Sequence, residues 1–254
     1  MASQIRAVDH EEMDLSAALC VVGFPGVGLV GRIATDFLVS QFELKRIASF
    51  RSDDFPPMAV LVGGQTMSPV RIHAAPMVCG VDGMCDQLAV LQAEITPAGD
   101  VLYELAEALI SWCLEKKVRE MVVLEGFVRP EGTKDAVVFG AGNNAETLGR
   151  MDKIGVKPLG EGVISGIAGP LSYLAEDRGL NVTVLLAETS REFPDARASA
   201  KLLEIIDPIV PHIDIDAEPL YERAELIETR LKENMEQHQE SVEGLTDRAK
   251  IMYG

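Results

Sequence analysis

The chain has 254 residues, with 40 acidic and 23 basic side chains, a formal net charge of −17 and 47% hydrophobic residues. This apolar content supports a substantial core and excludes a disordered chain. The acidic balance leaves no basic stripe that could neutralise phosphates, which argues against a nucleic-acid partner. No uncharged apolar run reaches transmembrane length, and the first residues contain no apolar signal core. We therefore expect a cytoplasmic protein with no membrane partner.

The cysteines and histidines give no sign of a metal site. Cys20, Cys79, Cys85 and Cys113 form no CxxC pair, and the four histidines are scattered along the chain. Because Cys20 and Cys113 lie in apolar segments, we expect the cysteines to be buried, reduced side chains in a reducing compartment. We expect no zinc or other metal.

Hydrophobic periodicity predicts strands alternating with helices along most of the chain. The predicted strands are Ile5–Val8, Leu19–Gly23, Lys45–Phe50, Ala59–Val62, Val70–Ala74, Leu88–Ile95, Met121–Glu125, Ala136–Phe139, Gly162–Ser165 and Val182–Glu188. The predicted helices run from Leu29, from Thr96-Pro97 to Lys116, from about Ala145 to Met151, from Gly169-Pro170 to Gly179, and from Pro194-Asp195 to Ile206. This alternation predicts a mainly parallel sheet covered on both faces. Gly63-Gly64-Gln65, between Ala59–Val62 and Val70–Ala74, predicts a hairpin that makes the sheet mixed.

The stretch Leu19–Ser40 is the opening unit of this α/β domain. Leu19–Gly23 is short and apolar, as expected for a strand buried on both faces. Pro25, Gly26 and Gly28 then break the periodicity and indicate a turn. From Leu29 the apolar residues recur at helical spacing. The sequence here predicts a strand, a glycine turn and a helix.

Two interpretations of this turn remain open. Gly26-x-Gly28-x-x-Gly31 matches the spacing of a dinucleotide fingerprint, with Asp53 and Asp54 as candidate ribose ligands downstream. However, Phe24-Pro25 separates the strand from the first motif glycine, and no Lys-Ser/Thr pair follows. The alternative is that Gly23, Pro25, Gly26, Gly28 and Gly31 form a structural turn that lets the strand and helix pack tightly.

Several carboxylates fall near predicted strand ends, where α/β proteins place their chemistry. Glu94, Glu125 and Glu188 could supply a general base if they converged. Carboxylates at strand ends are more often solvated or cap helices, and Ser165 lacks the flanking glycines of a nucleophile elbow. His73, in a predicted strand, is expected to be structural. We predict no catalytic residue and no cofactor.

The character of the chain changes after residue 213. Residues 214–240 are acidic but keep a narrow apolar stripe, which predicts a helix that packs against the body or a second copy. Residues 241–254 are polar until the ending Ile251-Met252-Tyr253-Gly254. We expect an α/β core domain over 1–213, an acidic helix over 214–240 and a flexible tail over 241–254.

Several stretches together resemble the archaeal members of the proteasome assembly chaperone family. They are Val22–Gly31 (VGFPGVGLVG), Phe55-Pro56-Pro57, the turn Gly166–Gly169 with Pro170, and Leu185–Thr189 with Pro194-Asp195-Ala196-Arg197. The resemblance covers about Leu19 to Ile206. It implies a three-layer α/β/α sandwich similar to that of nucleoside phosphorylases, no established enzymatic reaction, and a homo-oligomer.

The resemblance also implies a partner for the tail. Some family members end in a hydrophobic–Tyr–any residue motif that enters pockets between proteasome α subunits, and Met252-Tyr253-Gly254 fits that motif. Tyr253 would bury its ring while its hydroxyl keeps a polar partner, and Met252 would adapt to an apolar wall. The Gly254 carboxylate would pair with a lysine. We expect a non-enzymatic chaperone-like protein. The alternative is a small-molecule enzyme or nucleotide binder that uses the Gly26–Gly31 turn.

Overall fold

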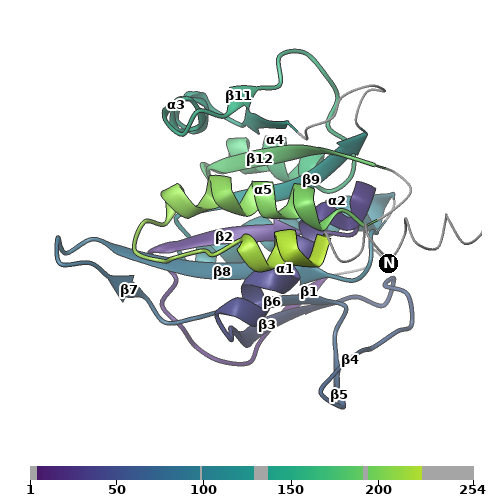
Figure 1. The fold of residues 1–254 in the computed structure, drawn as a ribbon. Helices are drawn as coiled ribbons and strands as arrows, with labels where there is room; N and C mark the ends of the chain where they lie inside the picture. Colours follow the sequence, from purple (N-terminus) through teal and green to yellow (C-terminus); the bar gives the residue numbers. More distant parts are fainter. Residues whose placement is uncertain (1–4, 98, 129–136, 191–193, 225–254) are drawn as a thin grey trace, which may run out of the picture.

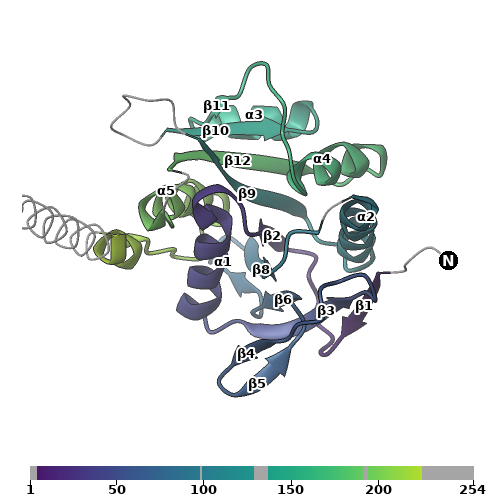
Figure 2. The same cartoon turned by 90° about the vertical axis from the view of Figure 1, so that its right-hand side faces the viewer.

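The structure, a computed structural model, describes residues 5–97, 99–128, 137–190 and 194–224. These residues form three layers, with one large sheet between two layers of helices (Figures 1 and 2). The strands are β1 (Arg6–Asp9), β2 (Ala18–Gly23), β3 (Lys45–Arg51), β4 (Val60–Val62), β5 (Gln65–Met67), β6 (Val70–Ala74), β7 (Val78–Cys79), β8 (Cys85–Ala93), β9 (Glu120–Val128), β10 (Val138–Gly142), β11 (Lys157–Pro158) and β12 (Val182–Thr189). The helices are η1 (Val27–Leu29), α1 (Val30–Gln41), α2 (Asp100–Glu115), α3 (Ala145–Lys153), α4 (Ala168–Asp177), α5 (Ala196–Ile206) and η2 (Asp207–Ile209).

The large sheet has ten strands in the order β1-β3-β6-β8-β2-β9-β12-β10-β11, with β7 paired to β8. Its centre is parallel, because β8, β2, β9 and β12 run in the same direction. On one side, β3 and β6 run antiparallel to their neighbours. On the other side, β10 runs antiparallel to β12 and parallel to β11. The prediction of a three-layer α/β/α sandwich with a mainly parallel, mixed sheet is confirmed.

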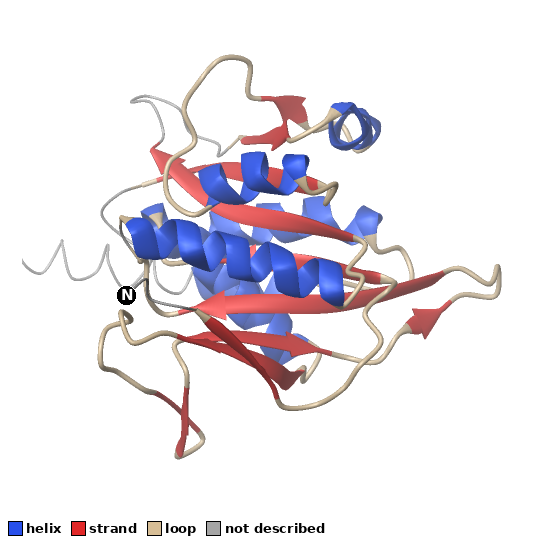
Figure 3. Ribbon diagram, turned by 180° about the vertical axis from the view of Figure 1, so that it is seen from behind, coloured by secondary structure: helices blue, strands red, loops and turns tan. Residues whose placement is uncertain are grey.

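Each face of the sheet has its own apolar core. On one face, α1 and α5 pack through residues at helical spacing, such as Ala34, Leu38 and Leu203. On the other face, α2 and α4 contribute residues such as Leu105, Leu109 and Leu171. The central strands β2 and β12 are buried along their whole length because both faces are covered. Helices on both sides of the sheet are visible when Figures 1 and 3 are compared.

Three local predictions are wrong. The Gly63-Gly64 turn joins β4 to β5, so the second hairpin strand is Gln65–Met67, and Val70–Ala74 instead enters the large sheet as β6. Residues 162–165 form no strand, and the large sheet ends at β11. Thr96 does not cap α2, which begins after Gly99; its hydroxyl donates to the Pro25 carbonyl instead, 2.7 Å away.

The cysteine prediction is half correct. Cys20 and Cys113 are buried thiols. Cys79 and Cys85, however, form a disulfide, and Cys79 is exposed. The turn between β7 and β8 places these two residues directly opposite each other across an antiparallel pair, a proximity that their spacing in the sequence does not reveal.

The described chain ends beside the α1/α5 face. Residues 218–224 are helical, and Leu220 and Ala224 are buried in the core of that face. The rest of the predicted acidic helix and the predicted tail, including Met252, Tyr253 and Gly254, lie outside the described residues. Among the described helices, none is both long and apolar enough to cross a bilayer.

Candidate functional site

The carboxyl ends of the parallel strands β8, β2, β9 and β12 meet at one edge of the sheet. This edge holds the glycine turn that follows β2, and it is where α/β proteins commonly bind ligands. The glycine turn and the carboxylates predicted at strand ends are therefore described by their positions relative to this edge.

The glycine turn is a corner at which three backbones touch. A Cβ on Gly23 would lie 2.2 Å from the Gly31 carbonyl oxygen, and a Cβ on Gly31 would lie 2.2 Å from the Leu124 carbonyl oxygen. Gly28 has a φ of +63°, in the left-handed region that favours glycine. These contacts give the glycines a structural reason: β2, α1 and β9 approach more closely than any side chain would allow.

One glycine of this corner escaped the sequence reasoning. A Cβ on Gly126 would lie 2.2 Å from the Val27 carbonyl oxygen, so β9 needs a glycine where η1 crosses it. Gly126 directly follows the predicted strand Met121–Glu125. A glycine at that position was the one feature of the sequence that could have indicated the close contact.

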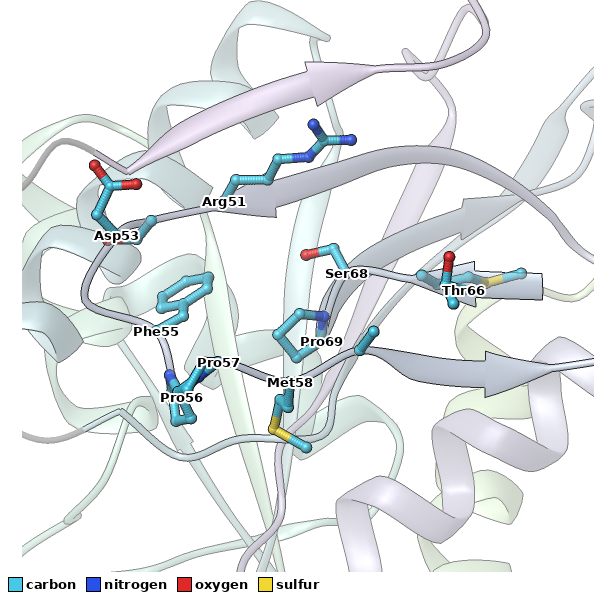
Figure 4. Close-up of a pocket in the computed structure, with 12 residues that line it drawn as sticks. Arg51, Asp53, Phe55, Pro56, Pro57, Met58, Thr66, Ser68 and Pro69 are labelled. Atoms are coloured by element: carbon cyan, nitrogen blue, oxygen red, sulfur yellow. The ribbon is translucent and has the colours of Figure 1, made fainter. Parts of the chain in front are cut away.

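The topology does not fit the dinucleotide interpretation. Asp53 and Asp54 follow β3, and β6 and β8 lie between β3 and β2 in the sheet. Asp53 instead lines a cleft of about 500 Å³, together with Phe55 and the prolines that follow it. Figure 4 shows Arg51 and Asp53 near one side of this cleft and the prolines with Met58 on the other. The candidate ribose ligands are thus remote from the Gly26–Gly31 turn.

The three strand-end glutamates do not converge on one point: Glu94 lies on the α1 face of the sheet, whereas Glu125 and Glu188 lie on the other face, on neighbouring strands. Glu94 packs against α1, where it accepts hydrogen bonds from Arg32 at 2.7 and 3.0 Å and from Arg71 at 2.8 Å. Glu125 lies on the opposite face, because its neighbour Leu124 packs toward α1 and successive strand residues alternate. The carboxylate of Glu188 accepts a hydrogen bond from the Val137 backbone amide at 3.1 Å.

Glu125 differs from the other two. Among the described residues its carboxyl group has no hydrogen-bond or ion-pair partner, and one of its oxygens would lie 2.8 Å from a Cβ placed on Gly26. Burial raises the pKa of Glu125 to about 7. A carboxyl group against Gly26 disfavours a bound anion at this turn, because it becomes a negative charge when it ionises.

Glu125→Gln tests this environment through pH. The unfolded chain releases the Glu125 proton near pH 4.5, whereas the folded chain holds it up to about pH 7, so the wild-type loses stability as pH rises between these values. We expect Glu125→Gln to raise the midpoint of thermal unfolding at pH 8 and to have less effect at pH 5. Glu107→Gln, at an exposed position of α2, is the control. An equal change for Glu125→Gln at both pH values would contradict the assigned pKa.

Asp195 joins the glycine turn to α5. Its backbone amide donates to the Gly28 carbonyl at 2.9 Å, and its carboxylate accepts from the Thr189 hydroxyl at 2.8 Å and from the Ala198 amide at 2.9 Å. Asp195 is therefore the N-cap of α5, as the Pro194-Asp195 signal predicts. The sequence did not reveal its link to Gly28. The late Pro-Asp segment and the early glycine stretch thus form one structural unit.

The fold and the residues at the carboxyl ends of the parallel strands together define a class of protein. It is a three-layer α/β/α protein in which a glycine corner and a helix cap close that edge of the sheet. The PAC2 family profile matches residues 20–235, and the chain belongs to the PAC2 family.

Several similar proteins come from archaea. The chain is 29% identical over 238 residues to the uncharacterised protein MJ0106 of Methanocaldococcus jannaschii, covering 94% of each. It is 27% identical to Pyrococcus furiosus PbaA, described as an archaeal homolog of proteasome-assembly chaperone, with a TM-score of 0.84 over 99% of this chain and 100% of that one. Pyrococcus furiosus PbaB, described as an archaeal proteasome activator, shares the fold, with a TM-score of 0.79 at 22% identity over 91% and 99% of the two chains.

Proposed function

We infer that this protein is a non-enzymatic, proteasome assembly chaperone-like protein that oligomerises, docks its C-terminal tails into pockets of the proteasome α ring and assists α-subunit assembly. The observation that carries the inference is the match to PbaA, which spans nearly the whole of both chains. Assembly is the favoured role, and activation of a finished particle is the related one.

The residues at the strand-end edge favour a binding role for this protein over an enzymatic one. Glu94 is held by two arginines and Glu188 is hydrogen-bonded, while Gly23 and Gly31 are in contact with backbone carbonyl groups. The polar groups predicted at this edge are thus largely engaged in holding the fold together. A surface or a terminal segment is then the better candidate for recognition.

The tail supplies suitable chemistry. Met252 offers an adaptable apolar side chain, Tyr253 an aromatic ring with a hydroxyl, and Gly254 a terminal carboxylate. One such tail is a weak ligand, but several tails on one oligomer gain about 10²–10⁴-fold in avidity if they dock together. Oligomerisation is therefore part of the proposed mechanism.

Capture of proteasome α subunits from the same organism tests this proposal. We expect the full chain to capture them, and we expect deletion of Met252–Gly254 or the substitution Tyr253→Ala to reduce capture by about 10²-fold, because each docked tail loses its aromatic anchor. Tyr103→Ala, which truncates an exposed tyrosine of α2, is the matched control and should capture as wild type does.

Light scattering after size-exclusion chromatography completes the test. Multivalent docking requires an oligomer, so a strictly monomeric chain would contradict the mechanism. Capture that survives deletion of Met252–Gly254 would contradict the role of the tail.

A small-molecule enzyme that acts on an uncharged nucleoside is the second candidate, and Glu125 is the observation that favours it. A carboxyl group with a pKa of about 7 is suited to general-base chemistry. Stabilisation of the protein by nucleosides, unaffected by deletion of Met252–Gly254, would support this alternative.

A further inference from the structure

A second polar region lies beneath the β4–β5 hairpin, away from the glycine corner. The hairpin projects from the body beside α1 (Figures 1 and 2), and a cleft of about 720 Å³ lies between it, α1 and the strands β3, β6 and β8. This volume is within the usual range for small-molecule sites, about 300–1,000 Å³.

The polar side of this cleft is built from charged residues. Arg71 and His73, two residues apart on β6, are 2% and 7% exposed, and both line the cleft. Arg71 and Arg32 bind Glu94, and Arg32 also pairs with Asp36 at 3.1 Å. This pairing fixes two guanidinium groups in place on the floor of the cleft.

Arg46 supplies a positive charge that is not neutralised. It lies opposite His73 in the β3–β6 register and lines the cleft. Within the described part of the chain, its guanidinium makes no hydrogen bond or salt bridge. The lining therefore carries three guanidinium groups and two carboxylates. Burial, and then the charges of Arg71, Arg46 and Arg32, lower the pKa of His73 to about 4, so its ring is neutral near pH 7.

Two buried polar atoms of the cleft residues also lack partners. The Arg71 Nε and His73 Nδ1 atoms are buried without a hydrogen-bond partner among the described residues. Such groups are rare in native proteins, because an unpaired buried donor or acceptor costs about 1–3 kcal/mol. Each unpaired buried polar group in a native protein calls for an explanation, and a polar ligand in the cleft would supply one.

The opposite side of the cleft is apolar. Val39 and Leu44 line it near α1, and the hairpin contributes Val60, Leu61 and Val62. Leu61 is 70% exposed and Val62 50% exposed, so much of their apolar surface can be covered by a ligand. The cleft combines one excess positive charge with an apolar wall.

We propose that this cleft binds a small molecule that carries one carboxylate on an apolar body, with the carboxylate paired to the Arg46 guanidinium and the body against the β4–β5 hairpin. A carboxylate matches the fork of a guanidinium group. A phosphate dianion fits less well, because Asp36 and Glu94 lie in the same lining and would repel it. The carboxylate can belong to a free acid or to the C-terminus of a peptide.

Titration calorimetry with a panel of probes tests the proposal on the full chain. The free acids are acetate, 4-methylpentanoate and 4-phenylbutanoate, and 4-phenylbutanamide is the uncharged control. The peptide Ile-Met-Tyr-Gly, with a free or an amidated C-terminus, represents the second source. We expect at least one apolar carboxylate to bind about tenfold more tightly than its amide.

Arg46→Gln should weaken this binding about tenfold, because it removes the unpaired charge but breaks no ion pair of the fold. Arg51→Gln, on the same strand but outside this cleft, is the matched control and should bind as wild type does. Circular dichroism establishes that both variants are folded. Binding of the free acid or of the free-terminus peptide, lost in Arg46→Gln, identifies the source. No binding by any carboxylate at millimolar concentration, equal binding of acid and amide, or unchanged binding by Arg46→Gln would overturn the proposal.

Discussion

Substituting alanine for Gly31 is expected to lower the free energy of unfolding by about 3 kcal/mol. The new methyl group would lie 2.2 Å from the Leu124 carbonyl oxygen, a backbone atom that cannot rotate away. Helix α1 would have to move off β9, which would disturb the packing of Val30 and Ala34 in the core. Alanine favours a helix by about 1 kcal/mol over glycine, so the clash must exceed this gain. Urea unfolding followed by circular dichroism measures the difference.

Gly149→Ala is the matched control for this experiment. Gly149 also lies within a helix, α3, but a Cβ there meets no atom within 4 Å. The same substitution should therefore leave stability unchanged or raise it by up to about 1 kcal/mol. If Gly31→Ala behaved in the same way as Gly149→Ala, the close contact between α1 and β9 would be refuted.

Replacing Glu94 with glutamine is expected to cost about 3 kcal/mol of stability at pH 7. Breaking a buried ion pair by removing one partner costs about 3–5 kcal/mol. The lower end applies because the Glu94 side chain is 21% exposed and that of Arg32 is 20% exposed. Arg71, at 2% exposure, would keep its charge without its carboxylate partner. Chemical denaturation at pH 7 measures the loss.

The pH dependence of this stability loss distinguishes the loss of the ion pair from a change in packing. Burial alone would raise the pKa of Glu94, but hydrogen bonds from Arg32 and Arg71 and their charges outweigh it, so its pKa lies below the usual 4.5. The ionised carboxylate therefore stabilises the fold above pH 4.5, and this contribution is lost as pH falls through the folded-state pKa. The gap between wild type and Glu94→Gln should narrow in acid. Glu176→Gln, at an exposed site on α4, should show no such gap, and a gap that stays constant with pH would contradict the ion pair.

The glycine corner shows how much of a site a sequence can reveal. The apolar run of Leu19–Gly23, the turn residues and the helical spacing after Leu29 predicted β2 and α1 nearly to the residue. The same pattern could not decide against a dinucleotide site, because the spacing of glycines indicates the conformation of the turn but not which residues lie beside it. The strand order decided against that interpretation by placing Asp53 beyond β6 and β8.

Glu94, in contrast, has an environment that the sequence could not predict. Its place after an apolar strand made it a candidate general base, but the structure gives it two arginine partners. Those partners are 62 and 23 residues away along the chain, and no local pattern connects them. The cleft beneath the β4–β5 hairpin was missed for the same reason, since its residues come from six separate helices and strands. The Arg71-x-His73 spacing on β6 would have been a weak signal at most.

The sequence by itself determined the fold class, the helices and most of the strands, because apolar periodicity, caps and turn residues act over a few neighbouring positions. It also carried the family resemblance that the PAC2 match confirms. Only the tertiary structure decided which strands pair, that Cys79 meets Cys85, and which carboxylates are bound by arginines. Those contacts join residues far apart along the chain, and their free energy depends on burial and distance, which exist only once the chain has folded.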